Sequence, residues 1–166
     1  MILKYIFYIS FSSLLFFNPS ISEVRELYKK AVTSEEVADQ FYNALENVKK
    51  TDNAVLVAYK AASLTIKGKY AEGAKNKKIY FKNGVTLLEY IINENPNLIE
   101  LRVIRLSIQE NAPKVLKYKK NMSEDASFIY QHLKEVKNKD KKAYISAYVL
   151  QSKSFSPEEK NVISEL

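Results

Sequence analysis

The chain contains no cysteine, one histidine, three glycines and four prolines among its 166 residues. The absence of cysteine excludes disulfides, thiolate metal sites, cysteine nucleophiles and a lipoprotein anchor. His132 stands alone, which excludes a multi-histidine metal centre, and no Gly-x-Ser-x-Gly turn accompanies it for a serine triad. Gly68 and Gly73 lack the spacing of a phosphate-binding loop, and we interpret them as a turn between helices. We therefore predict no catalytic residue, no cofactor and no metal ligand.

The first 22 residues have the layout of a secretory signal peptide. Lys4 supplies a positive charge, residues 5–17 form an uncharged apolar run, and Ser20 and Ser22 are the small residues that signal peptidase requires. The run is shorter than the roughly 20 residues of a membrane-spanning helix. We expect cleavage after Ser22, which leaves residues 23–166 as a single domain in the periplasm or outside the cell. An uncleaved N-terminal anchor is the alternative, and it is the only membrane association that we expect.

Lysine supplies almost all of the positive charge. The chain has 26 basic residues, of which only Arg25, Arg102 and Arg105 are arginines, and its net charge is +7. A basic surface is typical of proteins that bind nucleic acid or anionic lipid. Acidic residues are interleaved along the whole chain, however, and export argues against a nucleic-acid partner. We interpret the lysines as a solvated surface, with contact to an anionic surface as the alternative, and predict no nucleic-acid partner.

Apolar residues recur at helical spacing after the N-terminal segment, and no segment alternates for long as a half-buried strand would. Residues 54–66 are apolar on nearly every side, which predicts a central, buried helix. Pro96 requires the helix before it to end near Asn95. The clearest helix start is at Ser156, which is followed by a proline and by a capping-box glutamate, Glu159. The other expected helices begin at Thr33 or Ser34, near Phe81, at Asn97 and at Ser123, with a short helix in residues 114–120 and another around residues 144–149.

Residues 80–109 resemble a junction between two tetratricopeptide-type repeats. Gly84 takes the position of a small residue, Leu88 that of a bulky residue, and Pro96 that of the terminal proline. Two positions depart from the pattern, because Ile91 stands where alanine is usual and Arg102 where an aromatic residue is usual. The resemblance implies stacked helical hairpins that bind other proteins.

Residues 94–97 and 100–109 also resemble an uncharacterised group of small exported bacterial proteins, which implies no activity. Helices joined by short turns pack as antiparallel neighbours. The expected fold is therefore all-α, with antiparallel αα-hairpins packed as a short tetratricopeptide-like array or as an irregular helical bundle.

Two of the three arginines lie in one predicted helix, where Arg102, Arg105 and Gln109 share a face. A guanidinium binds a carboxylate through two parallel hydrogen bonds, which lysine cannot do. The arginines could therefore form an internal clamp with Glu89 or Glu94, or an open face that binds a partner's acidic groups. We assign Arg102 to the clamp and take Arg105 and Gln109 as candidate binding residues, with Arg102 joining them if the clamp is absent.

These patterns lead to three hypotheses about function. The first is an exported helical module that binds or scaffolds another envelope or secreted protein. The second is a small enzyme that uses carboxylates near the Pro96 turn, such as Glu89, Glu94 and Glu100, although no spacing selects a catalytic pair. The third is a structural envelope protein that self-associates. A concave groove lined by exposed tyrosine and arginine would favour binding, and a closed pocket with buried pairs of glutamates would favour catalysis. A compact bundle without such features would favour neither.

Overall fold

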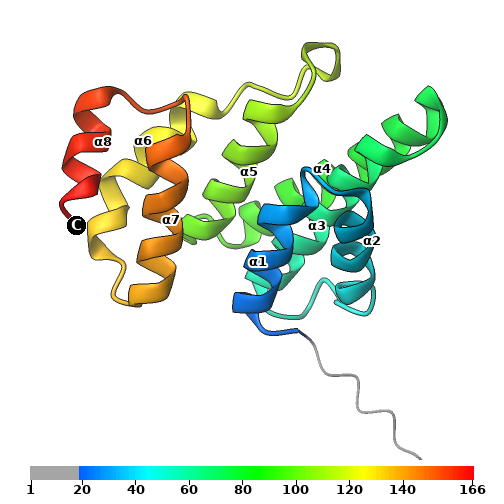
Figure 1. The fold of residues 1–166 in the computed structure, drawn as a ribbon, viewed down its shortest axis with the longest axis horizontal. Helices are drawn as coiled ribbons and strands as arrows, with labels where there is room; N and C mark the ends of the chain where they lie inside the picture. The colour runs from blue at the N-terminus through cyan, green and yellow to red at the C-terminus, as the bar shows by residue number, and fades with distance from the viewer. Residues whose placement is uncertain (1–18) are drawn as a thin grey trace, which may run out of the picture.

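The computed structural model describes residues 19–166, and Figure 1 shows their arrangement. Within this range the chain forms α-helices and two 3-10 helices and contains no strand, so the all-α prediction is confirmed. Most of the predicted signal peptide lies outside the described residues. The elements are α1 (Ile21–Ala31), α2 (Glu35–Ala44), α3 (Ala54–Tyr70), α4 (Gly73–Glu94), α5 (Ile99–Asn111), η1 (Lys114–Leu116), α6 (Met122–His132), η2 (Leu133–Glu135), α7 (Lys139–Gln151) and α8 (Pro157–Ser164).

Local sequence signals account for several helix starts. The predicted capping box at Ser156 is present, because the serine side chain accepts from the Glu159 N–H and the glutamate accepts from the Ser156 N–H. Ser34 caps α2, which was one of the two alternatives. The predicted caps of α5 and α6 were displaced. A turn from Asn95 to Leu98 delays the start of α5 until Ile99, and α6 already begins at Met122.

One helix, α1, was not among the predicted elements. It begins with a second capping box, formed by Ser20 and Glu23, and buries Val24, Tyr28 and Ala31 at helical spacing. The sequence signal was therefore present, but it overlaps the end of the predicted signal peptide. Cleavage after Ser22 would remove the cap and cut within the first turn of α1.

The helices form two hydrophobic clusters that share α5. Figure 1 shows α5 between α1–α4 and α6–α8. The N-terminal lobe (α1–α4) packs on one face of α5, through Leu101, Ile104 and Ile108. The C-terminal lobe (α6–α8) packs on another face, through Ile99, Val103 and Leu106. The predicted central helix, now α3, is buried within the N-terminal lobe, but the helix between the lobes is α5.

The helices α3 and α4 form the longest hairpin of the fold. We expected Gly68 in the turn, but α3 continues through it to Tyr70, and only Gly73 adopts a left-handed conformation, with φ of 72°. Gly84 allows the two helices to approach closely, since a Cβ there would lie 2.6 Å from the Ala61 carbonyl oxygen. The tip of the hairpin projects from the lobe (Figure 1).

The segment that follows α5 contains less helix than predicted. Instead of a helix across residues 114–120, it has the single 3-10 turn η1, which ends where Lys117 adopts φ of 50°. Among the described helices none is both long and apolar enough to cross a membrane.

Candidate functional site

The buried arginine cluster joins α5 to α6. Arg105 is 3% exposed, and its guanidinium donates from Nε to Asp125 Oδ2 and from Nη2 to Asp125 Oδ1, both at 2.6 Å. Its third nitrogen donates to Glu89 Oε2 of α4 at 2.9 Å. Asp125 is completely buried, so the pair is a bidentate ion pair held away from water.

Arg102 extends the same cluster at its edge. Its Nη1 donates to Glu124 Oε1 at 2.7 Å and to Asp125 Oδ1 at 3.1 Å, and its guanidinium carbon lies 5.2 Å from the centre of the Phe128 ring. The predicted clamp partners, Glu89 and Glu94, are not its partners. The physical reason is that α6, not α4, covers this side of Arg102.

The two candidate binding residues do not lie on an open surface. Arg105 is enclosed by the ion pairs, and Gln109 is completely buried, with neither Oε1 nor Nε2 hydrogen-bonded within residues 19–166. The structure thus places the predicted shared face of α5 in the interior. The arrangement stabilises the junction between helices and leaves no route for a partner's acidic groups to reach Arg105.

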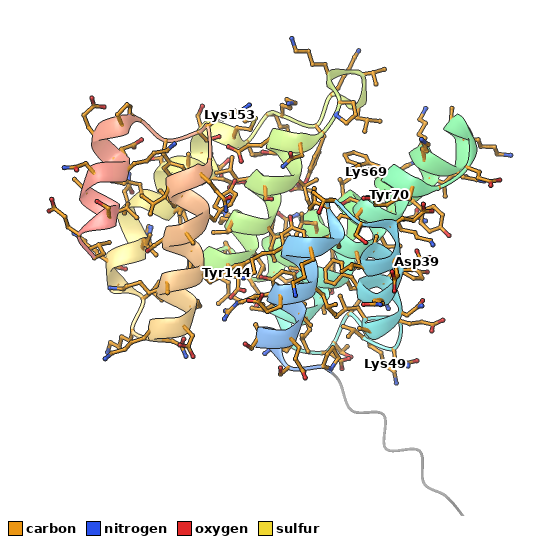
Figure 2. All side chains as sticks on the ribbon, viewed as in Figure 1. Asp39, Lys49, Lys69, Tyr70, Tyr144 and Lys153 are labelled. Carbon is orange, nitrogen blue, oxygen red and sulfur yellow. The ribbon has the colours of Figure 1, made fainter. Side chains whose placement is uncertain are left out.

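A cleft of about 820 Å³ lies between α1 and α7, and α5 forms its floor. We call it the inter-lobe cleft. Figure 2 shows Tyr144 on the side of α7 that faces α1, and Lys153 beyond the end of α7. The lining carries charges of both signs together with hydroxyl groups. Its polar and aromatic residues are Ser22, Arg25, Glu26, Tyr28, Lys29, Thr33, Ser107, Glu110, Asn111, Asp140, Tyr144, Tyr148, Gln151, Ser152 and Lys153.

Arg25 fixes the wall that α1 contributes to the cleft. It donates from Nε and Nη2 to the two oxygens of Glu100, at 2.8 and 2.7 Å, and Tyr59 donates to the same carboxylate at 2.9 Å. The Arg25 guanidinium also lies 5.1 Å from the centre of the Tyr144 ring. Burial raises the pKa of Tyr144 to about 12, so this phenol stays neutral near pH 7. Arg25 therefore connects α1 to both α5 and α7.

Glu110 fixes the opposite end of the cleft. Its carboxylate accepts from Ser152 Oγ at 2.6 Å, Ser154 Oγ at 2.7 Å and Tyr148 Oη at 2.8 Å, and from the Lys153 N–H at 3.1 Å. Burial alone would raise the pKa of Glu110, but these hydrogen bonds outweigh it and hold the pKa below its ordinary value. The charged carboxylate thus anchors the chain after α7 onto the end of α5.

The carboxylates near the Pro96 turn do not form a catalytic pair. Glu89 pairs with Arg105 and accepts from Tyr118, Glu100 pairs with Arg25, and Glu94 is exposed. These three carboxylates therefore differ in their partners and in their exposure. Among the described residues, no group of three His, Asp or Glu side chains is placed to hold a metal ion.

Sequence reasoning missed the residues that build the cleft. Arg25 is the one arginine outside the predicted pair, and Tyr144 and Tyr148 are spaced by one helical turn, so each had a visible signal. Glu110 had none. No protein-family profile, curated protein or solved structure matches this chain, so its function must be argued from its own geometry.

Proposed function

We propose that this protein is a helical binding module that holds a segment of another exported protein in the inter-lobe cleft. The observation that carries the proposal is the open cleft between α1 and α7, with tyrosines, Arg25 and fixed hydroxyls along its lining. A peptide segment presents alternating donors and acceptors, and a lining with charges of both signs can pair with them. The tyrosines and Arg25 in the lining support the proposal of a binding site.

The rigidity of the lining favours binding over catalysis. Arg25 and Glu110 are already held by internal hydrogen bonds, so little side-chain entropy is lost when a partner covers them. Tyrosine and arginine also contribute most often to the binding energy of protein interfaces. The Arg25 and Glu110 contacts thus hold both ends of the cleft in a shape that is ready to bind.

The experiment places a photo-crosslinking residue at Gln151, which is exposed and lines the cleft, in the native host. The matched control carries the same residue at Ala44, which is exposed on α2 and does not line the cleft. We expect a discrete crosslinked product from position 151 and none from position 44. A second variant, Ala147→Trp, fills the cleft from an exposed position on α7 and should abolish the product.

The possible products separate the hypotheses. A product of twice the chain's mass would indicate self-association, which was the structural alternative. Equal crosslinking from both positions, or a product that survives Ala147→Trp with unchanged yield, would contradict binding in the cleft. Circular dichroism of each variant should match the wild type, because Gln151, Ala44 and Ala147 are all exposed.

A further inference from the structure

A second concave site lies on the other side of α1, between the tip of the α3–α4 hairpin and the segment after α5. This hairpin groove has a volume of about 660 Å³, within the range of about 300–1,000 Å³ that is typical of small-molecule sites. Its walls come from the ends of α1, α3 and α5, from the start of α4 and from η1. The apolar and aromatic lining residues are Tyr28, Val32, Ile66, Ala74, Phe81, Ile108, Ala112, Pro113, Val115 and Leu116.

The charged groups of the hairpin groove are all positive. Lys69, Lys77 and Lys78 line it, and no aspartate or glutamate does, whereas three carboxylates line the inter-lobe cleft. Lys69 donates to the Val32 carbonyl oxygen at 2.6 Å, which holds it beside α1, and Figure 2 shows it near the end of α3. Lys77 and Lys78 are exposed and make no ion pair within residues 19–166. Their charges are therefore available to an anion at the rim.

The rim also exposes apolar surface. Val115 of η1 is 83% exposed although it lines the groove. Exposed apolar groups beside unpaired lysines match a ligand that is itself apolar along its length and anionic at one end. The lysines of the groove favour an anionic ligand over a cationic one.

The two sites are separate although they adjoin. Tyr28, Val32, Ser107 and Asn111 line both, and the Tyr28 hydroxyl donates to Ser107 Oγ at 3.0 Å between them. An occupant of the hairpin groove therefore need not enter the inter-lobe cleft. The inference that follows is independent of the proposed function.

We propose that the hairpin groove binds a single-chain anionic amphiphile of the fatty-acid class. The alkyl chain lies against the apolar wall between α3, α4 and η1, and the carboxylate lies at the rim beside Lys77 and Lys78. A membrane surface is a different partner, and the experiment below treats it as an opposing outcome.

Isothermal titration calorimetry with dodecanoate, decanoate and dodecyltrimethylammonium tests the proposal on residues 19–166 and on the full chain. Dodecanoate should bind at one site per chain. Decanoate lacks two methylenes and should bind about 15-fold more weakly, since each buried methylene is worth roughly fourfold in affinity. The cationic probe should not bind, because the lysines repel it.

Variants of exposed residues locate the site without disturbing the core. Ala74→Trp fills the groove from an exposed position and should abolish dodecanoate binding, whereas Ala147→Trp in the other cleft should leave it unchanged. The double variant Lys77→Gln/Lys78→Gln should weaken binding by about 3- to 20-fold, as expected for the loss of two exposed charge pairs. The matched control, Lys137→Gln/Lys139→Gln, removes the same net charge from exposed positions of the other lobe and should have no effect.

Three results would overturn the proposal. One is dodecanoate affinity that is unchanged by Ala74→Trp, and another is equal affinity for the cationic probe. The third is sedimentation with phosphatidylglycerol vesicles that persists in Ala74→Trp while dodecanoate shows no saturable binding, since the lysine surface would then bind a membrane without using the groove. If Ala147→Trp abolishes the crosslinked product but leaves dodecanoate binding intact, the result supports a protein site in the inter-lobe cleft and a separate amphiphile site in the hairpin groove.

Discussion

The two lobes share α5 but are stabilised in different ways. Twenty buried residues form the hydrophobic cluster of the N-terminal lobe and ten form that of the C-terminal lobe. In the larger cluster Tyr28, Phe41 and Tyr59 contact one another with ring centres 5.6 to 6.4 Å apart. The smaller cluster has a buried ion pair, Arg105 with Asp125, beside its junction with α5.

The difference shows how a short helical chain can attach a lobe with a small apolar core. The α1–α4 lobe is also joined to α5 by a bidentate ion pair, Arg25 with Glu100, but it has the larger apolar core and the close approach of α3 to α4. In the α6–α8 lobe the bidentate Arg105–Asp125 pair accompanies a smaller apolar core, and such a pair contributes little net stability but is very costly to break on one side only. Substitutions in the two lobes should therefore destabilise the protein by different mechanisms, and each prediction below tests that contrast.

The largest effect is expected from Arg105→Met. The substitution leaves Asp125 completely buried without its bidentate partner, and the free energy of unfolding should fall by about 3–5 kcal/mol. Urea denaturation measures the loss, and hydrogen exchange should show α6–α8 losing protection before α1–α4. The double variant Arg105→Met/Asp125→Asn should recover part of the stability, because the uncompensated charge is gone. If Arg105→Met melts at the wild-type temperature, the α6–α8 lobe does not depend on this ion pair.

The next effect is expected from Gly84→Ala in the N-terminal lobe. The added Cβ would lie 2.6 Å from both the Ala61 carbonyl oxygen and Thr65 Cγ2, so α3 and α4 must move apart. Overpacking of this kind costs about 1–3 kcal/mol, and thermal unfolding should show it. The control is Asn83→Ala at the exposed neighbouring position, which should change the melting temperature little. Equal melting temperatures for the two variants would show that the close approach of α3 to α4 at Gly84 does not contribute to stability.

Helix caps provide a matched pair, one in each lobe. Ser20→Ala and Ser156→Ala each remove a capping-box serine and should each lower the free energy of unfolding by about 1 kcal/mol. A chain that begins at Glu23 lacks Ser20 and should show a similar loss relative to one that begins at Ser20.

Mass spectrometry of the protein from its host tests whether the mature chain begins at Glu23, as the signal-peptide pattern predicts. An intact Met1 would contradict cleavage.

The smallest effect near neutral pH is expected from Glu110→Gln, since the amide oxygen can keep several of the hydrogen bonds. The native hydrogen bonds lower the pKa of Glu110 below its value in the unfolded chain. The stability that they provide is present above the unfolded pKa, ordinarily about 4.5, and is lost as pH falls through the lower folded value. The wild type should therefore lose more stability than Glu110→Gln between pH 6 and pH 3, as followed by thermal melts. Parallel curves for the two proteins would exclude this linkage.

Local signals allowed much of the helical structure to be predicted. The stop before Pro96 and the start at Ser156 depend on the geometry of a few neighbouring residues, so each could be identified in isolation. The cap of α5 was displaced because the turn that precedes it has its own hydrogen bond, from the Leu98 N–H to the Asn95 carbonyl oxygen. The helix α6 begins one residue before the expected cap, Ser123. The overlap of α1 with the signal-peptide pattern hid a helix whose spacing was otherwise clear.

The site residues were harder to predict because carboxylates stand on both sides of Arg102 in the sequence. Arg102 was assigned to Glu89 or Glu94, yet its partners are Glu124 and Asp125. Each of these carboxylates would satisfy a guanidinium equally well. The choice depends on which helix packs against α5, and that information is absent from the spacing of residues.

The sequence by itself determined that this chain is helical, where several of its helices begin or end, and which residues of α5 share a face. Only the tertiary structure decided that the Arg105–Gln109 face is buried and that the open surfaces are the inter-lobe cleft and the hairpin groove. The physical reason is the distance along the chain over which each interaction acts. A cap or a proline acts within one turn, whereas Arg25 and Glu100 are 75 residues apart and meet only because every element between them has packed.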